Sequence, residues 1–131
     1  IMELRAYNTV YGVWKYFTVD DERIDLSKNN YLYIVTLEGY TKIREYFGAD
    51  RVVPIYIEVE DGERLMRAIA REQKQDVPKY EEMCRRFLAD SADFSEEKLV
   101  EAGIVRRFSN NDFVQTVREV TAYIADEIAA E

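Results

Sequence analysis

The sequence predicts an α/β domain in which a small β region precedes a parallel sheet with flanking helices. Three observations support this. Aromatic and β-branched residues dominate positions 1–19, strand-like and helix-like patterns alternate from residue 31 onward, and hydrophobic residues make up 47% of the chain. That hydrophobic content is enough for a core and excludes a disordered tail. At 131 residues we expect a single domain.

The first 30 residues predict a small antiparallel β region. Residues 1–7 alternate like a strand already in progress, so we interpret the chain as cut inside a domain. Asn8 and Thr9 are predicted to form a turn, and residues 10–19 a second strand with a bend at Gly12. Residues 20–30 are polar and predict a loop.

The alternation from residue 31 predicts a βαβ unit. The continuous apolar run of residues 31–37 is typical of a strand buried on both faces. A helix over 39–47 should end at Gly48, and residues 51–58 form the next strand. Two strands joined in this way should be parallel, with a right-handed crossover.

The remainder predicts four helices and one strand. Asp61 can cap a helix that runs through Arg71, and a polar break over 73–78 separates it from a helix over 79–93. Ser95 can cap a third helix ending near Gly103. Residues 104–108 form a short strand, and residues 111–130 a long amphipathic helix.

The composition narrows the classes of partner. The formal net charge of −8, with no histidine, argues against a nucleic-acid-binding surface and removes the usual zinc ligands. No apolar run is long enough to cross a membrane. The single cysteine, Cys84, excludes an intrachain disulfide, so a cytoplasmic protein is the expectation. A local basic patch can still bind phosphate in an acidic chain.

Arginines on two successive helices are the first candidate site. Arg64, Arg67 and Arg71 are spaced to lie along one side of a helix, and Arg85 and Arg86 follow on the next helix. Facing helices of this kind could clamp the oxygens of a nucleotide phosphate. The alternative is a solvated surface, because Glu63 and Arg67 have the spacing of an ordinary i,i+4 ion pair.

Two further groups of residues could contact a ligand. At the front end, Glu3 and Tyr11 could bind a guanine edge and a phosphate. Packing between strands is the alternative for this region. Residues 108–112 form a polar turn at the sheet edge where ligands bind in open α/β folds. The same residue types also cap helices.

Taken in order, these segments resemble successive parts of guanylate kinase, over essentially all 131 residues. The segments that carry the resemblance are Glu3, Tyr11–Gly12, Leu37–Gly39, Val53–Ile57, Leu65–Arg71, Arg86–Phe87 and Asn110–Asp112. The resemblance implies a P-loop nucleoside-monophosphate-kinase-like parallel sheet. Residues 1–30 would be the GMP-binding β region, and residues 31–131 the core sheet, the lid helices and the C-terminal helix.

The resemblance also implies a role for single residues. Glu3, Tyr11 and Thr36 would bind GMP, and Asn110 would lie near the adenine of ATP. Arg67 and Arg71 look like lid arginines that reach the ATP phosphates, and Arg86 like an arginine over the transferring group. ATP and Mg²⁺ would be the cofactors, with no protein metal ligand assigned. Val13 and Thr36 stand where the family has a hydroxyl residue and a carboxylate.

The phosphate-binding loop of the family is missing from these residues. It requires Gly-x-x-x-x-Gly-Lys-Ser/Thr, but no two of the five glycines stand five apart and none precedes a lysine. The resemblance places that loop on a central strand upstream, so we expect about 50–60 further residues in a parent protein. If only these residues are present, a second copy of the chain or a rearrangement is expected to fill the gap.

Three functional hypotheses follow. The first is a guanylate-kinase-type enzyme that converts ATP and GMP to ADP and GDP, with these 131 residues inactive alone. The second is a non-catalytic guanylate-kinase-like module that binds a phosphorylated partner or a nucleotide. The third is a structural or oligomer-forming role without a nucleotide.

Overall fold

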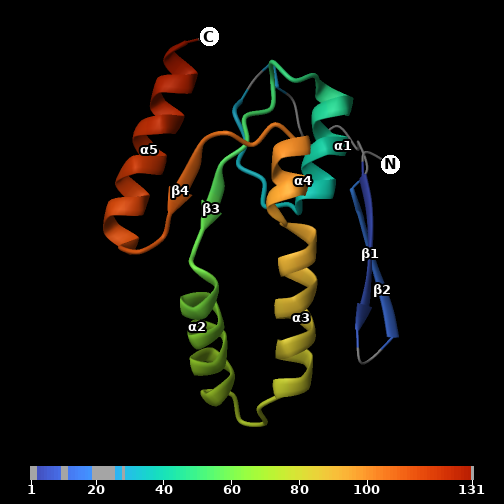
Figure 1. Ribbon diagram of the computed structural model, residues 1–131. Coiled ribbons are helices and arrows are strands. Elements are labelled where there is room, and N and C mark those ends of the chain that lie inside the picture. Colours follow the sequence, from blue (N-terminus) through green and yellow to red (C-terminus); the bar gives the residue numbers. More distant parts are fainter. Residues whose placement is uncertain (1–2, 10–11, 19–25, 28, 131) are drawn as a thin grey trace.

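The computed structural model describes residues 3–9, 12–18, 26–27 and 29–130, with side chains described from residue 26 onward. Two small sheets and five helices make up this part of the chain (Figure 1). In chain order they are β1 (Glu3–Thr9), β2 (Gly12–Thr18), α1 (Leu37–Phe47), β3 (Tyr56–Glu58), α2 (Asp61–Gln73), α3 (Tyr80–Asp93), α4 (Glu96–Glu101), β4 (Arg107–Ser109) and α5 (Phe113–Ala129).

The antiparallel front end is confirmed, but the predicted turn is wrong. β1 and β2 pair antiparallel from Glu3 opposite Thr18 to Thr9 opposite Gly12. Asn8 and Thr9 therefore belong to the ladder, because Thr is well suited to a strand and the pairing continues to its end. The residues that connect the two strands lie outside the described residues.

The predicted buried strand over residues 31–37 is also wrong. Residues 31–36 have no regular secondary structure, and Leu32 and Ile34 are 83% and 96% exposed. An apolar run becomes a buried strand only where neighbouring strands pair with it and helices cover it. Within the described residues the two sheets are β1–β2 and β3–β4, so the predicted crossover from 31–37 to 51–58 is not formed.

Among the described residues, the parallel pair is instead β3 with β4. Tyr56 lies opposite Arg107 and Glu58 opposite Ser109. Both strands are shorter than predicted, covering three residues each. Helices α2, α3 and α4 connect the two strands. Helix α5 follows β4 in the chain and packs against it (Figure 1). The domain thus combines helices with parallel strands, whereas the finer assignment to a kinase fold stays a prediction.

The predicted helices are confirmed, with small shifts of their first residues. α1 begins at Leu37 because the Thr36 hydroxyl accepts a hydrogen bond from the Gly39 amide at 3.1 Å. It ends at Gly48, whose φ of 99° favours glycine. Ser95 and Asp112 cap α4 and α5 with their side-chain oxygens. The cap of α2 is Glu60 and not Asp61, as its carboxylate is the one that reaches the first amides.

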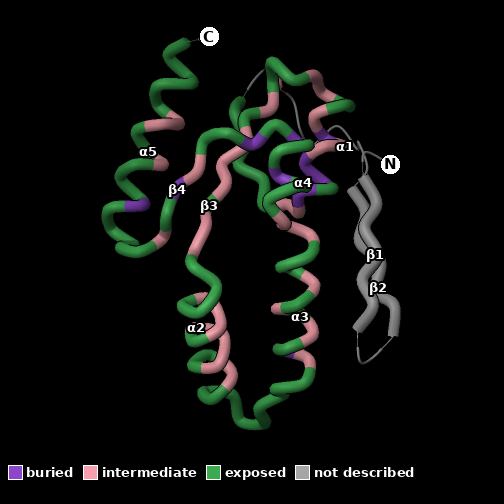
Figure 2. Tube along the Cα trace, in the orientation of Figure 1, coloured by how far each residue is buried: buried purple, intermediate pink, exposed green. Residues whose placement is uncertain are grey.

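Buried residues gather where α1, α4 and the segment leading to β4 meet (Figure 2). The core cluster consists of Leu37, Tyr40, Leu99, Ala102 and Ile104, with Val35, Val52, Tyr56 and Phe94 packed against it. Arg44 donates to the carbonyl of Ala102 at 2.9 Å and so ties α1 to the end of α4. By contrast, α2 has no buried residue and α3 only Met83. These two helices project from the core as an antiparallel pair, called the arm below (Figure 1).

Candidate functional site

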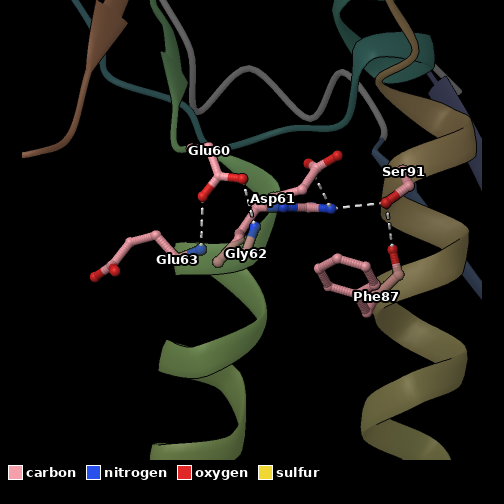
Figure 3. A network of polar contacts seen from close by, with 7 residues as sticks. Glu60, Asp61, Gly62, Glu63, Phe87 and Ser91 are labelled. Carbon is pink, nitrogen blue, oxygen red and sulfur yellow. Dashed lines mark hydrogen bonds and ion pairs between the residues drawn. The ribbon is translucent and has the colours of Figure 1, made fainter.

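The first helix of the arm, α2, is capped at its N-terminus by Glu60. The Glu60 carboxylate accepts hydrogen bonds from the amides of Gly62 and Glu63 at 2.9 and 3.0 Å (Figure 3). These bonds hold the pKa of Glu60 below its ordinary value, because they stabilise the ionised form. The cap fixes the direction in which α2 leaves β3 and hence where its arginines lie.

Arg64 joins the two helices of the arm. Its guanidinium donates to the Ser91 hydroxyl at 2.7 Å and lies 3.6 Å from the Asp61 carboxylate. The same group stacks over the Phe87 ring, with 4.3 Å from its central carbon to the ring centroid. Ser91 in turn donates to the carbonyl of Phe87 (Figure 3). Arg64 therefore connects the first turns of α2 to the last turns of α3, at the end of the arm next to the core.

A cleft of about 590 Å³ lies between α2 and α3. Its residues come from both helices and from the connection between them: Arg64, Ala68, Arg71, Glu72, Gln75, Val77, Lys79, Met83, Arg86, Phe87 and Asp90. Four of these side chains are cationic and two are anionic. The cleft is therefore net positive although the whole chain carries a net charge of −8. Such a site attracts a phosphate.

Arg71 and Arg86 face this cleft from opposite walls. Both are exposed, and among the described residues neither makes a side-chain hydrogen bond or an ion pair within 4.0 Å. Arg86 lies in the longer-range field of Asp90. Two guanidinium groups that are not held by carboxylates are able to bind phosphate oxygens in a bidentate way.

Asp90 is the acid that α3 contributes to the lining of the cleft. The pKa of its carboxyl is raised, first because the group loses hydration between the helices and also because Asp93 lies nearby. Arg64, Arg85 and Arg86 oppose this effect without overcoming it. The other acid of the cleft, Glu72, accepts a hydrogen bond from the Lys79 amide at 2.8 Å.

The remaining arginines of the arm serve other contacts. Arg67 donates to Glu63 at 2.9 Å and to the carbonyl of Asn110 at 3.0 Å. It thus ties α2 to the turn between β4 and α5, and it does not line the cleft. The alternative of an ordinary Glu63–Arg67 pair is confirmed. Arg85 is held by the Glu82 carboxylate on its own helix.

The structure thus brings Arg64, Arg71 and Arg86 together at the cleft, whereas Thr36, Arg67 and Asn110 are not among the residues that line it. The backbone amide of Asn110 donates a hydrogen bond to the Glu58 carbonyl, and its own carbonyl accepts one from Arg67. Thr36 caps α1. Glu3 lies in β1, where side chains are not described, and Tyr11 lies outside the described residues. A nucleotide shared between them and the arm stays a prediction.

Sequence reasoning missed Lys79, Glu72 and Asp90 as parts of the cleft. A signal for Asp90 existed, since it follows Arg86 by four residues and therefore shares its side of a helix. Lys79 precedes α3, and no spacing rule connects a helix-flanking residue to the opposite helix. Its place depends on how the connection over residues 74–79 turns.

No match emerged when the chain was compared with protein-family models, curated proteins and solved structures. In the described part of the chain, no three Cys, Asp or Glu side chains are grouped so that they could hold a metal ion. Nor does any described helix have the length and apolar character needed to cross a membrane.

Proposed function

We propose that the arm binds the phosphates of a nucleotide and serves as the lid of a guanylate-kinase-type nucleoside monophosphate kinase. The observation that carries this proposal is the convergence of Arg71 and Arg86 on a net-positive cleft, where no carboxylate of the described residues holds either of them. The order of segments that resembles guanylate kinase supports it from the sequence.

In this proposal the chain contributes binding and orientation. Arg71 and Arg86 hold the ATP phosphates and neutralise the charge that develops as the γ-phosphoryl group moves to GMP. Arg67 positions α2 against the turn at Asn110, where the adenine would lie. Transfer also requires a phosphate-binding loop, which these 131 residues do not contain.

Binding is the part of the proposal that can be tested on this chain. We expect titration calorimetry to detect ATP, and we expect Arg71→Ala and Arg86→Ala each to weaken the affinity by roughly tenfold or more. Arg118→Ala is the matched control, because Arg118 is exposed on α5, outside the cleft. Loss of affinity in Arg118→Ala equal to that in the cleft variants would show general charge attraction and contradict the proposal.

Turnover is tested in the gene product that contains these residues. Arg86→Ala should lower kcat far more than it raises KM for GMP, since a group that acts on the moving phosphoryl contributes mainly in the transition state. An equal loss in both parameters would contradict the role proposed for Arg86.

A second candidate is a non-catalytic module that binds a phosphorylated partner. It is favoured by Thr36, whose hydroxyl accepts the capping hydrogen bond at the start of α1 and which stands where the resembling family has a carboxylate. A phosphopeptide should then displace ATP from the cleft, and the gene product should transfer no phosphoryl group. Turnover with GMP would exclude this candidate.

A further inference from the structure

Asp90 occupies an unusual position for an acid, because this exposed residue lines the cleft that is proposed to bind an anion. It stands one helical turn after Arg86 on α3. Its backbone carbonyl accepts from the Phe94 amide, but its carboxylate makes no ion pair within 4.0 Å and no side-chain hydrogen bond in the described part of the chain. The carboxylate is therefore not fixed by a structural contact.

Charged side chains from both helices surround Asp90. From α2, Arg64 is already held by Ser91 and Asp61. From α3, Arg85 is held by Glu82, and Asp93 adds a like charge. Arg86 is the remaining cation of α3 in its field. The other charged residues of the cleft are Arg71, Glu72 and Lys79.

A phosphate bound by Arg71 and Arg86 would enter the same field as the Asp90 carboxylate. The two anions would repel each other across a cleft that already removes hydration from the carboxyl. Protonation of Asp90 relieves the repulsion and raises the net charge of the cleft lining from +2 to +3. The raised pKa of Asp90 means that this proton is taken up more readily than by an ordinary aspartate.

We propose that Asp90 is a resident counter-anion of the cleft, which weakens the binding of phosphate-bearing ligands and, in mildly acidic solution, takes up a proton from solvent when such a ligand binds. This inference rests on the proposed function, because it assigns a control element to the same site. It implies that ligand affinity rises as the pH falls. Asp90 thus sets how strongly charged a ligand must be in order to remain bound near neutral pH.

Titration calorimetry with Mg²⁺-free ATP tests the proposal. At neutral pH, Asp90→Asn should bind ATP about five- to tenfold more tightly than the unmodified chain. The ratio of the two affinities should approach one as the pH falls, and this ratio cancels the titration of ATP itself. Asp126→Asn, the same change at an exposed position of α5, should leave the affinity unchanged.

Proton uptake provides a second measurement. Binding enthalpies, measured at mildly acidic pH in buffers of different ionisation enthalpy, should show more proton uptake by the unmodified chain than by Asp90→Asn. Circular dichroism checks that the variants fold, and Asp90→Ser removes the same charge if Asp90→Asn does not fold. Detectable ATP binding by Asp90→Asn alone would also support the proposal.

The outcomes separate this inference from the proposed function. If ATP binding depends on Arg71 and Arg86 but is the same with Asp90→Asn, the role of Asp90 is refuted and the phosphate site stands. Identical proton uptake by the unmodified chain and by Asp90→Asn would likewise refute the role of Asp90 and leave the phosphate site standing. If neither chain binds millimolar ATP, the phosphate site is refuted, and the role of Asp90 with it.

Discussion

The arm and the core are built on different interactions. In the core, Leu99 is 2% exposed within a cluster of apolar side chains. In the arm, Leu88 is 68% exposed, and the helices are joined by Arg64 and by a few partly buried side chains (Figure 2). Elements with few buried contacts open at low free-energy cost, which suits a lid that closes on a ligand. The core, in turn, holds the sheet from which the arm projects.

The largest expected effect is on the free energy of unfolding, when leucine is replaced by alanine in the core and, for comparison, in the arm. Leu99→Ala should lower the free energy of unfolding by about 2–5 kcal/mol, because it leaves a cavity in the core cluster. Leu88→Ala should change it by no more than about 0.5 kcal/mol, as its side chain is mostly in water. Urea denaturation measures both. Similar losses for the two variants would show that the arm is packed as tightly as the core.

Replacing a glycine by alanine should have an effect of intermediate size on stability, and the core and the arm each offer one such glycine. Gly48→Ala, at the end of α1, should cost about 1–3 kcal/mol, because its φ of 99° is strained for other residues. An added Cβ would also lie 2.9 Å from the Asp50 carboxylate. At Gly62 in the arm, the closest atom would be at 3.1 Å, on the Glu60 carboxylate, and the backbone of Gly62 does not have a positive φ. Gly62→Ala should therefore cost less, and a larger loss of thermal stability at Gly62 would contradict this assignment of strain.

The smallest expected effect concerns the pH dependence of the arm. Because the folded pKa of Glu60 lies below its ordinary value of 4.5, its cap stabilises α2 above that value and is lost as the pH falls through the folded pKa. The amide chemical shifts of Gly62 and Glu63, followed by NMR on acidification, should report this loss. Glu60→Gln should abolish the transition.

Glu81→Gln is the matched control for that titration. Glu81 is an exposed acid in the first turn of α3, outside the α2 cap. This variant should leave the amide transition of Gly62 and Glu63 in place. Persistence of the transition in Glu60→Gln would assign it to another acid.

Sequence reasoning succeeded where the signal is local. Capping residues, glycines after the last turn, a polar break and amphipathic patterning together located the five helices of the described chain, with Glu60 in place of Asp61 as the cap of α2. The arginine spacing placed Arg64 and Arg71 on one side of α2, and both line the cleft. Arg67 does not line the cleft, because its guanidinium donates hydrogen bonds to the Glu63 carboxylate and to the Asn110 carbonyl.

The failures occurred where a residue's state depends on distant neighbours. The apolar run over residues 31–36 meets every local criterion for a strand, yet Ile34 is almost fully exposed. The parallel partner of β3 turned out to be β4, about fifty residues away in the chain. Pairing of parallel strands depends on which segments meet in space, and residue types do not encode that choice locally.

By itself the sequence determined the helices of this protein, their ends and the acidic character of the chain, because caps, glycines and charges act over a few residues. Only the tertiary structure decided which charges share a cleft. Arg71, Lys79, Arg86 and Asp90 come from two helices and the connection between them, and their convergence depends on how α2 and α3 pack. The electrostatic field of a site is a sum over neighbours in space, and that sum exists only once the chain has folded.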